Sequence, residues 1–395
     1  MLGVITKILN VFKRNQTRNS NNKDSANLLI ISFDQWRGDW GNTNKPIIEL
    51  PTIQNIAREG LVLENCYTNS PQCVPARFSW LTGLEPSQMG VTKNEDISLP
   101  VDAPSNIREL KKLGWHTRII GKTHWSTHNS GKDIREKEYL IRSLGFENIT
   151  EITGPRALRF INSQITDDWK NEGVLERQRD DLDYRYRNIR EEEAWKSRET
   201  VLPKHLYPDI WISEKAKEQI DELPEDKPWI CWVSFVGPHE PFDTPKPWRG
   251  MTNKEGLPKP IEERKWIKNL SSNCHMKLIE KKWENKLTEN MVQELRQDYG
   301  DHLRLLDEQT KEIIDKLKKR SDFSNTGIVI MSDHGEMLGD GGMLYKSTFI
   351  ESSINVPMIY RPPNGISKYT IKEPINLSGI FTIILKGLNK GGVID

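Results

Sequence analysis

The chain lacks a net charge of either sign, a pattern of paired cysteines and a long apolar run. Its 395 residues include 57 basic and 56 acidic side chains, and a net charge of +1 argues against a nucleic-acid-binding protein, whose footprint is strongly basic. No apolar run approaches the ~20 residues that span a bilayer, so stable membrane insertion is not expected. The cysteines have no tight paired spacing, which argues against a zinc cluster and a disulfide scaffold; they are Cys66, Cys73, Cys231 and Cys274.

Residues 1–26 are expected to form a flexible tail. They begin with an apolar stretch that ends at Lys13 and Arg14, whereas a secretory signal places its charge before an unbroken apolar run. The rest of the tail is polar. We therefore expect a cytoplasmic protein, with a periplasmic or membrane-associated location as alternatives, and a catalytic domain over residues 27–395.

Apolar runs alternate with amphipathic stretches along the chain. Residues 27–33 form a continuous apolar run, which is typical of a strand buried on both faces. The alternation predicts an α/β fold with a mostly parallel central sheet and helices on both faces. Strands are predicted at residues 27–33, 61–66, 115–120, 229–236, 326–331 and 356–360, helices at 51–59, 103–113, 210–223 and 289–320 (one helix or two), and a strand followed by a helix at 375–388.

Two segments interrupt this pattern. Residues 126–208 are rich in charge and are predicted to be an insertion of helices and loops with a solvated face. Residues 243–285 are rich in Pro, Lys and Trp and are predicted to form a long loop over the site.

Polar residues follow four of the predicted strands. In a parallel sheet the ligand site forms beyond the carboxyl ends of the strands, so we expect these side chains to converge. The residues are Asp34, Gln35, Lys122, His124, His239, Asp333 and His334.

The stretch CVPARFSWLTG, from Cys73 to Gly83, combines a thiol with a helix start. Pro75 fits the first turn of a helix, which places Cys73 at the N-terminus, where the helix dipole favours an anion. Arg77 lies one turn further on the same face and offers a guanidinium for an oxyanion. These residues leave two interpretations open: a nucleophile in an anion site, or a small buried hydrophobic side chain, as most free cysteines are.

Two pairs of residues at strand ends have the ligand types of a divalent metal site. Asp34 with Gln35, and Asp333 with His334, supply two carboxylates, an amide oxygen and an imidazole. The alternative is a strand-end aspartate that caps the next helix. His128 follows His124 at a spacing of four, but the polar residues around them predict a loop rather than a helical zinc pair.

The motif Cys-x-Pro-x-Arg followed by Leu-Thr-Gly resembles the active-site signature of the type I sulfatases. The segment from Ser332 to Asp340, continuing to Lys346 and Val356-Pro357, is similar to a late segment of the same family. The resemblance runs from about residue 27 to residue 388 and is weak through the middle. It implies an alkaline-phosphatase-like fold, in which the smaller C-terminal subdomain usual in relatives is short or absent here.

In that family the cysteine is oxidised after translation to Cα-formylglycine, whose hydrated aldehyde is the nucleophile. The resemblance therefore implies formylglycine at Cys73 and a maturation enzyme as a partner. It also implies one divalent metal ion, Ca²⁺ first, with Mn²⁺ or Mg²⁺ as alternatives because the nitrogen of His334 softens the site. The implied ligands are Asp34, Gln35, the modified Cys73, Asp333 and His334.

The resemblance assigns further roles to basic residues. Lys122 and His124 would contact the sulfuryl oxygens and the formylglycine, His239 would lie near the leaving group, and Lys346 would bridge substrate and site, although a lone lysine is usually just exposed. Cys73 and Arg77 complete this catalytic set. The implied activity is hydrolysis of a sulfate monoester of a small molecule or carbohydrate. The alternatives are a phosphonate monoesterase or phosphodiesterase of the same superfamily, and an inactive sulfatase-like binding protein.

Overall fold

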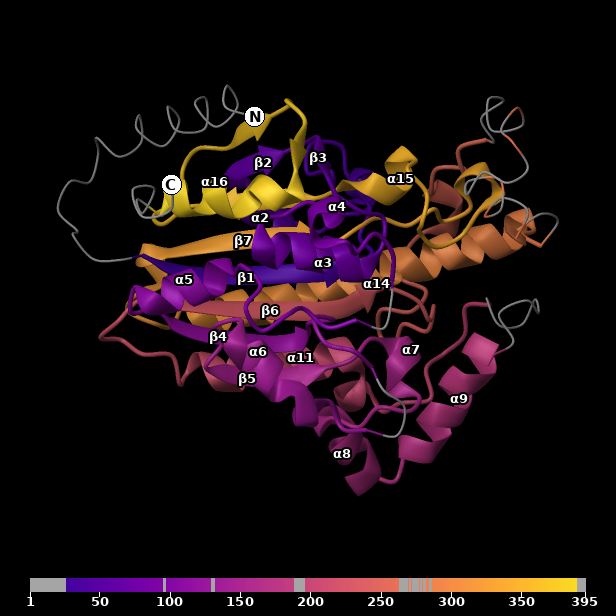
Figure 1. Cartoon of the computed structure of the whole chain (residues 1–395). Coiled ribbons are helices and arrows are strands. Elements are labelled where there is room, and N and C mark those ends of the chain that lie inside the picture. Colours follow the sequence, from indigo (N-terminus) through magenta and orange to yellow (C-terminus); the bar gives the residue numbers. More distant parts are fainter. Residues whose placement is uncertain are drawn as a thin grey trace.

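The computed structural model describes residues 26–388, apart from 95–96, 129–131, 188–195 and most of 263–285. At its centre lies an eight-stranded sheet with the strand order β10-β2-β9-β7-β1-β6-β4-β5 (Figure 1). Neighbouring strands run parallel except β9, which is antiparallel to both β2 and β7. The strands are β1 (Asn27–Asp34), β2 (Leu61–Leu63), β4 (His116–Lys122), β5 (Asn148–Ile152), β6 (Trp229–Pro238), β7 (Thr326–Ser332), β9 (Met358–Arg361) and β10 (Tyr369–Ile371).

A small second sheet lies beside the first. It has three short strands in the order β11 (Ile375–Asn376), β3 (Cys66–Tyr67) and β8 (Asn355–Val356).

The central strand β1 explains why helices cover both faces of the main sheet. All eight of its residues are buried between β6 and β7. Alternate side chains point to opposite faces, so Leu29 and Ile31 join one apolar cluster whereas Leu28 and Ile30 join the other. The first cluster is covered by α2 (Pro51–Arg58), α11 (Pro208–Ile220) and α14 (Glu289–Leu317), and the second by α3 (Cys73–Thr82), α5 (Asn106–Lys112) and α16 (Ile380–Gly387).

Several helix ends follow from local sequence. Pro51 occupies the first turn of α2, where its missing N–H costs nothing. The Ser105 side chain caps α5 by accepting a hydrogen bond from the Arg108 N–H. Gly83 ends α3 in the left-handed region, with φ of 73°, which a glycine adopts without steric cost.

The predicted α/β fold with a mostly parallel sheet is confirmed, with differences in detail. Residues 289–317 form one helix, α14. The predicted strand at 61–66 divides into β2 and β3, which belong to different sheets. The charge-rich segment 126–208 contains β5, an edge strand that the sequence analysis missed because its sequence, NITEI, has only two apolar residues.

The remaining elements are short helices and turns. The other α-helices are α4 (Pro86–Met89), α6 (Glu138–Ser143), α7 (Pro155–Leu158), α8 (Gln164–Asn171), α9 (Leu175–Arg187) and α15 (Glu351–Ile354). Single 3₁₀ turns lie at Gly38–Gly41, Ile134–Lys137, Lys204–Leu206, Lys254–Gly256, Phe323–Asn325, Asp340–Gly342 and Leu377–Gly379.

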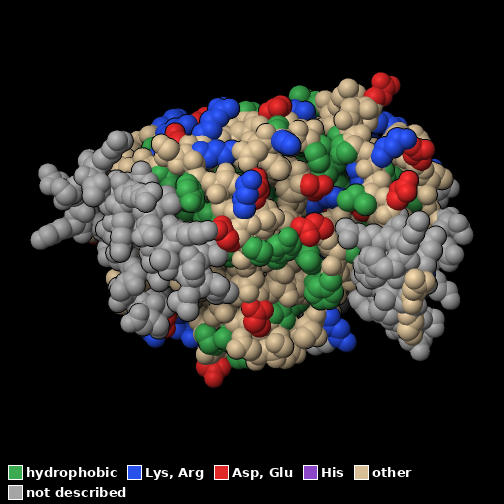
Figure 2. All heavy atoms as spheres, turned by 90° about the horizontal axis from the view of Figure 1, so that it is seen from above, with side chains coloured by type: hydrophobic (Ala, Val, Ile, Leu, Met, Phe, Trp, Pro, Cys, Tyr) green, Lys and Arg blue, Asp and Glu red, His purple; other side chains and the backbone are tan. Residues whose placement is uncertain are grey.

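The distribution of charge on the surface and the polarity of the helices agree with the amino-acid composition. On the face seen in Figure 2, basic and acidic side chains are interspersed, as a near-zero net charge leads one to expect. Within the described ranges, no helix combines the length and the apolar character needed to cross a membrane.

Candidate active site

The polar residues at the strand ends meet at one edge of the main sheet. The strands that carry them, β7, β1, β6 and β4, are consecutive neighbours. The Gln35 backbone N–H donates to Asp333 Oδ1 at 3.0 Å, and the Lys122 ammonium pairs with Asp34 Oδ2. Both contacts join residues that are far apart in the chain. The convergence predicted from parallel topology is therefore present in the structure.

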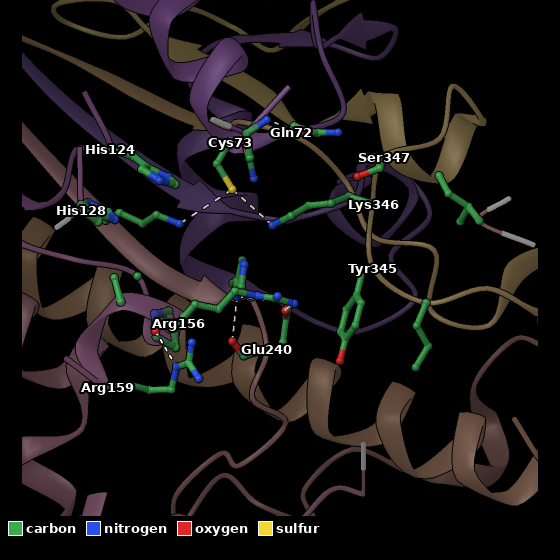
Figure 3. A pocket seen from close by; sticks show the side chains of 18 of the residues that line it. Gln72, Cys73, His124, His128, Arg156, Arg159, Glu240, Tyr345, Lys346 and Ser347 are labelled. Atoms are coloured by element: carbon green, nitrogen blue, oxygen red, sulfur yellow. Dashed lines mark hydrogen bonds and ion pairs between the residues drawn. The ribbon is translucent and has the colours of Figure 1, made fainter. Parts of the chain in front are cut away.

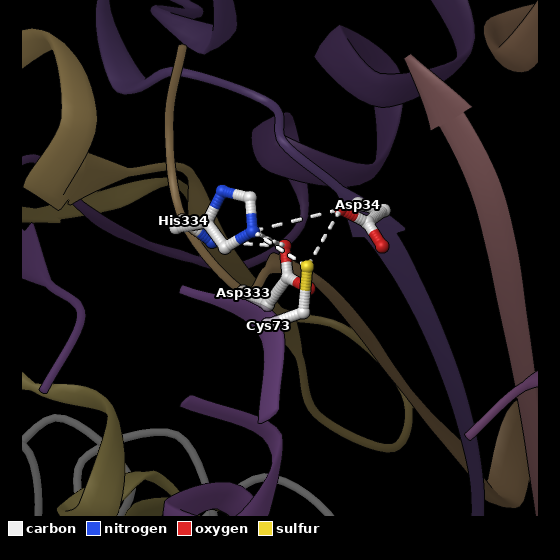
Figure 4. Close-up of side chains that lie close together, drawn as sticks. All are labelled: Asp34, Cys73, Asp333 and His334. Carbon is white, nitrogen blue, oxygen red and sulfur yellow. Dashed lines mark hydrogen bonds and ion pairs between the residues drawn. The ribbon is translucent and has the colours of Figure 1, made fainter. Parts of the chain in front are cut away.

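Four buried side chains form a cluster with the donor types of a metal site: Asp34, Cys73, Asp333 and His334 (Figure 4). One ligand atom from each lies within 4.8 Å of all the others. His334 Nε2 is 3.2 Å from Cys73 Sγ, 3.6 Å from Asp34 Oδ1 and 3.7 Å from Asp333 Oδ1. Two hard carboxylate oxygens with one imidazole nitrogen fit Ca²⁺, Mn²⁺ or Mg²⁺.

In each of the two aspartates, one carboxylate oxygen lies near His334 of this cluster and the other contacts a positively charged side chain. Asp333 Oδ2 accepts from Arg77 Nε at 2.7 Å, and Asp34 Oδ2 accepts from Arg77 Nη2 at 3.3 Å and from Lys122 Nζ. Both Oδ1 atoms lie on the side of His334, within 3.7 Å of its Nε2. Burial opposes ionisation of Asp34, but Lys122 and other nearby positive charges hold its pKa well below the usual range.

Arg77 thus orients carboxylates. Its Nη1 donates to the Lys122 carbonyl at 2.8 Å and to Ser234 Oγ at 3.1 Å, and its side chain is only 1% exposed. The predicted position on the same face of α3 as Cys73 is correct, but the guanidinium does not line the pocket described below. It contacts Asp34 and Asp333, which belong to the metal-type cluster.

Cys73 is the first residue of α3, and all ten residues of this helix are buried. Lys346 Nζ lies 3.2 Å and Lys122 Nζ 3.9 Å from its sulfur. Burial by itself would raise the pKa of the thiol, but Lys122, Lys346 and His334 lower it well below its usual range. The site therefore stabilises a negative charge at position 73.

A pocket of about 490 Å³ opens in front of Cys73 (Figure 3). Among the predicted catalytic residues, Lys122, His124, His239 and Lys346 line it with Cys73. The predicted insertion contributes residues 128, 154–157, 159 and 160, and the predicted loop contributes residues 279, 282 and 283. The structure describes residues 243–262 of that loop, whereas most of residues 263–285 lies outside the described residues.

His239 is held by its neighbour in the chain. Its Nδ1 lies 2.7 Å from the Glu240 carbonyl oxygen and 3.2 Å from Glu240 Oε2. A proton on Nδ1 leaves Nε2 as the acid–base atom for the pocket. Burial opposes ionisation of Glu240, but His239 and Arg156 lower the pKa of its carboxyl to about 2.

Gln35, predicted as a metal ligand, directs its amide to Lys346 and two glutamates. Its Oε1 accepts from Lys346 Nζ at 2.6 Å, and its Nε2 donates to Glu240 Oε2 at 3.0 Å and to Glu336 Oε2. Its backbone has φ of 72°, a left-handed conformation supported by the Tyr299 hydroxyl, which donates to the Gln35 carbonyl at 2.7 Å. These bonds position Lys346 against Cys73.

Glu240 and Glu336 are residues that the sequence analysis missed. Each stands inside a motif that was selected for a neighbouring residue, Gly-Pro-His-Glu and Ser-Asp-His-Gly-Glu. Burial, with Glu240 nearby, raises the pKa of Glu336 to about 7. The sequence signal that could have identified them is their position, one residue after His239 and two residues after His334.

His124 and His128 lie in the loop predicted for them. Their rings stack in parallel with centroids 4.7 Å apart and an interplanar angle of 1°. Burial lowers the pKa of His124 from 6.5, so its imidazole is neutral near pH 7 and able to accept a proton.

Comparison with known proteins identifies relatives over nearly the whole chain. A family model described as Sulfatase matches residues 26–389. Arylsulfatase of Clostridium perfringens is 29% identical over 365 residues, which cover 87% of this chain and 69% of the relative. Choline-sulfatase of Rhizobium meliloti is 26% identical over 352 residues, which cover 85% of this chain and 62% of the relative. The chain thus spans between 62% and 69% of the length of these two relatives.

Solved structures share the fold at lower sequence identity. The phosphonate monoester hydrolase of Agrobacterium radiobacter superposes with a TM-score of 0.70 at 21% identity, covering 92% of this chain and 74% of that protein. A protein solved in complex with its substrate D-glucosamine-2-N,6-O-disulfate superposes with a TM-score of 0.66 at 17% identity, covering 93% of this chain and 77% of that protein.

Proposed function

This chain belongs to the sulfatase family of hydrolases, and we propose that it cleaves sulfate monoesters through a formylglycine made from Cys73. The proposal includes one divalent metal ion, Ca²⁺ first, at Asp34, Asp333, His334 and the modified residue 73. Its partners are then a maturation enzyme and the sulfate ester of a small molecule or carbohydrate. The observation that carries the proposal is the position of Cys73, at the start of α3, in contact with both the metal-type cluster and the pocket.

Substrate binding follows from the charges around position 73. Lys122 and Lys346 flank the sulfur of Cys73 and would hold the sulfuryl oxygens of the ester. Burial would lower the pKa of Lys346, but Cys73, Asp34 and Glu240 raise it, so the ammonium stays charged. When bound, the metal ion supplies positive charge that polarises these oxygens and favours deprotonation of the nucleophile.

The first step transfers the sulfuryl group to the protein. One hydroxyl of the hydrated formylglycine releases its proton to water, its oxygen attacks sulfur, and the bond between sulfur and the alcohol oxygen breaks. His239 Nε2 or Lys346 Nζ donates the proton that the leaving alcohol needs. Glu240 fixes the tautomer of His239 in this role.

The second step releases sulfate. The remaining hydroxyl of residue 73 loses its proton to the neutral imidazole of His124, the carbon–oxygen bond to sulfate breaks, and the aldehyde re-forms. Water then restores the diol. Arg77 keeps Asp34 and Asp333 oriented throughout.

The test uses protein produced with a maturation enzyme. Peptide mass spectrometry across residues 66–77 should find an aldehyde in place of the Cys73 thiol, and Cys73→Ala should abolish hydrolysis of an aryl sulfate. Cys66→Ala is the matched control, because Cys66 is also buried but lies outside the pocket, so this variant should retain turnover. Full activity of Cys73→Ala would end the nucleophile hypothesis.

A second candidate is hydrolysis of phosphonate monoesters, which are also tetrahedral monoanions. The nitrogen of His334 in the ligand cluster favours this alternative. The discriminating assay compares kcat/KM for an aryl sulfate and an aryl phosphonate monoester on matured enzyme. A tenfold preference for the phosphonate, about 1.4 kcal/mol of transition-state binding, would reverse our order.

A further inference from the structure

The pocket carries more positive charge than one sulfate ester requires. Among its described lining residues, five are Lys or Arg and one is acidic, Glu240. Lys122 and Lys346 are engaged at Cys73. The other three cations, Arg156, Arg159 and Lys282, form what we call the basic wall. Figure 3 shows Arg156 and Arg159 on the side of the pocket away from Cys73.

Aromatic rings hold the basic wall in place. The guanidinium of Arg156 lies 4.8 Å from the centre of the Tyr186 ring, and that of Arg159 lies 5.4 Å from the same ring. Lys282 Nζ lies 5.0 Å from the centre of the Trp283 ring. Stacking of this kind restricts the side chains before a ligand arrives, so less conformational entropy is lost on binding.

The acidic partners leave part of this charge for a ligand. Glu240 pairs with Arg156 at 3.0 Å, but its carboxylate also contacts His239 and accepts a hydrogen bond from Gln35. Arg159 donates from Nε to the Arg156 carbonyl at 2.8 Å and from Nη1 to Asp183 at 3.2 Å. Within the part of the chain that is described, Arg159 Nη2 has no hydrogen-bond partner. A planar guanidinium donor of this kind suits a sulfate or carboxylate group.

The same arrangement disfavours a cationic substrate. A quaternary ammonium group binds over the open faces of aromatic rings. Here the faces of Tyr186, Tyr345 and Trp283 are approached by the chain's own cations, with Lys282 Nζ 5.9 Å and the Arg156 guanidinium 5.8 Å from the centre of Tyr345. A substrate cation would meet like charges at this wall.

We propose that the basic wall is a second oxyanion subsite, so that preferred substrates carry a further sulfate or carboxylate group beside the ester that is cleaved. The inference rests on the proposed function only for the identity of the cleaved group. The volume of about 490 Å³ is within the range of pockets that hold a substrate of this size.

The test measures binding, which does not depend on turnover. Isothermal titration calorimetry on the matured, Ca²⁺-loaded protein compares benzenesulfonate with benzene-1,3-disulfonate, naphthalene-2,6-disulfonate, 3-sulfobenzoate and 3-(trimethylammonio)benzenesulfonate. We expect at least one doubly anionic probe to bind tenfold or more tighter than benzenesulfonate, and the ammonium probe to bind more weakly than benzenesulfonate. A gain with 3-sulfobenzoate assigns the subsite to carboxylates as well as sulfates, whereas a gain with disulfonates alone assigns it to sulfates.

Variants test whether the gain in affinity for doubly anionic probes comes from the basic wall. The ratio of affinities for the doubly and singly anionic probes is compared within each protein, so a general loss of binding cancels. Arg159→Gln should reduce the ratio to below threefold, and Arg159→Lys should retain part of it. Lys282→Gln, at an exposed position, should also reduce the ratio without a risk to folding. The control is Arg142→Gln on α6, outside the pocket, where the ratio should stay unchanged.

Two results would overturn the inference. One is equal affinity for all anionic probes in the unaltered protein while benzenesulfonate itself binds, which leaves the proposed function standing. The other is a ratio that survives in both Arg159→Gln and Lys282→Gln. If no sulfonate binds at all, the proposed function falls and the subsite falls with it.

Discussion

Replacing Arg77 by Met should test how the two aspartates of the site are held. The substitution keeps an unbranched apolar stem but removes the guanidinium, whose charge pairs with Asp333 at 2.7 Å and with Asp34 at 3.3 Å. Lys122 still neutralises Asp34, whereas among the described residues Asp333 keeps only backbone donors and the imidazole near its Oδ1. Arg77→Met therefore leaves a buried carboxylate without its cation.

The magnitude follows from burial. The side chain of Arg77 is 1% exposed and that of Asp333 is 0% exposed, so solvent screens little of the lost interaction. Removing one partner of a buried ion pair costs about 3–5 kcal/mol. With an unfolding entropy of about 2.1 cal/mol/K per residue, this corresponds to a fall of about 4–6 °C in Tm for a chain of 395 residues.

Thermal and urea unfolding in EDTA measure this effect without a metal contribution. The double variant Arg77→Met, Asp333→Asn should be more stable than the sum of the two single losses predicts, because the unpaired charge is gone. The control, Arg142→Met, breaks an exposed pair with Glu138 and should cost less than about 1 kcal/mol. An Arg77→Met loss no larger than the control, or strict additivity in the double variant, would refute the reasoning.

Three further predictions concern the metal, pH and the backbone. Chelation should abolish turnover, and Asp333→Asn should reduce bound metal below one ion per chain; full metal content in that variant, measured by elemental analysis, would contradict the ligand assignment. Burial raises the pKa of Glu151 from 4.5 to about 8, so the folded protein binds more protons than the unfolded chain in this window and its stability falls as pH rises through it. The stability gained by Glu151→Gln should therefore grow by up to about 1.4 kcal/mol per pH unit between pH 5 and pH 8 in urea unfolding, and a constant difference would argue against it. Gly121→Ala should lower the free energy of unfolding by at least about 3 kcal/mol, because the added Cβ would lie 2.0 Å from the Ser234 carbonyl oxygen. Gly173→Ala, where the added Cβ meets open space at a φ of 71°, should lower it by about 1–2 kcal/mol. Equal losses in the two variants would show that the contact with Ser234 is relieved.

Much of the fold and the location of the site could be predicted from local sequence pattern. The apolar run of β1 and the polar residues directly after β1, β4, β6 and β7 are local features, and parallel topology alone brings such strand ends to one edge. For the same reason the start of α3 at Cys73 could be predicted from Pro75 and the helix dipole.

The local sequence pattern could not predict which residues the polar side chains of the site contact. Arg77, expected at the substrate, pairs with Asp34 and Asp333, and the amide of Gln35, expected at the metal, accepts a hydrogen bond from Lys346. Each choice depends on distances between residues that are far apart in the chain, such as the 311 positions between Gln35 and Lys346.

Sequence alone determined which residue types reach the edge of the sheet, because hydrophobic periodicity and strand direction are properties of short segments. Tertiary structure alone decided how their charges are shared. Arg156 and Arg159 belong to a charge-rich segment with the pattern of a solvated face, and they line the pocket because the fold brings Glu240 and Tyr186 to them. A buried charge takes the partner that the packed chain places within a few ångströms, and the energy of that pairing depends on burial, which no local pattern encodes.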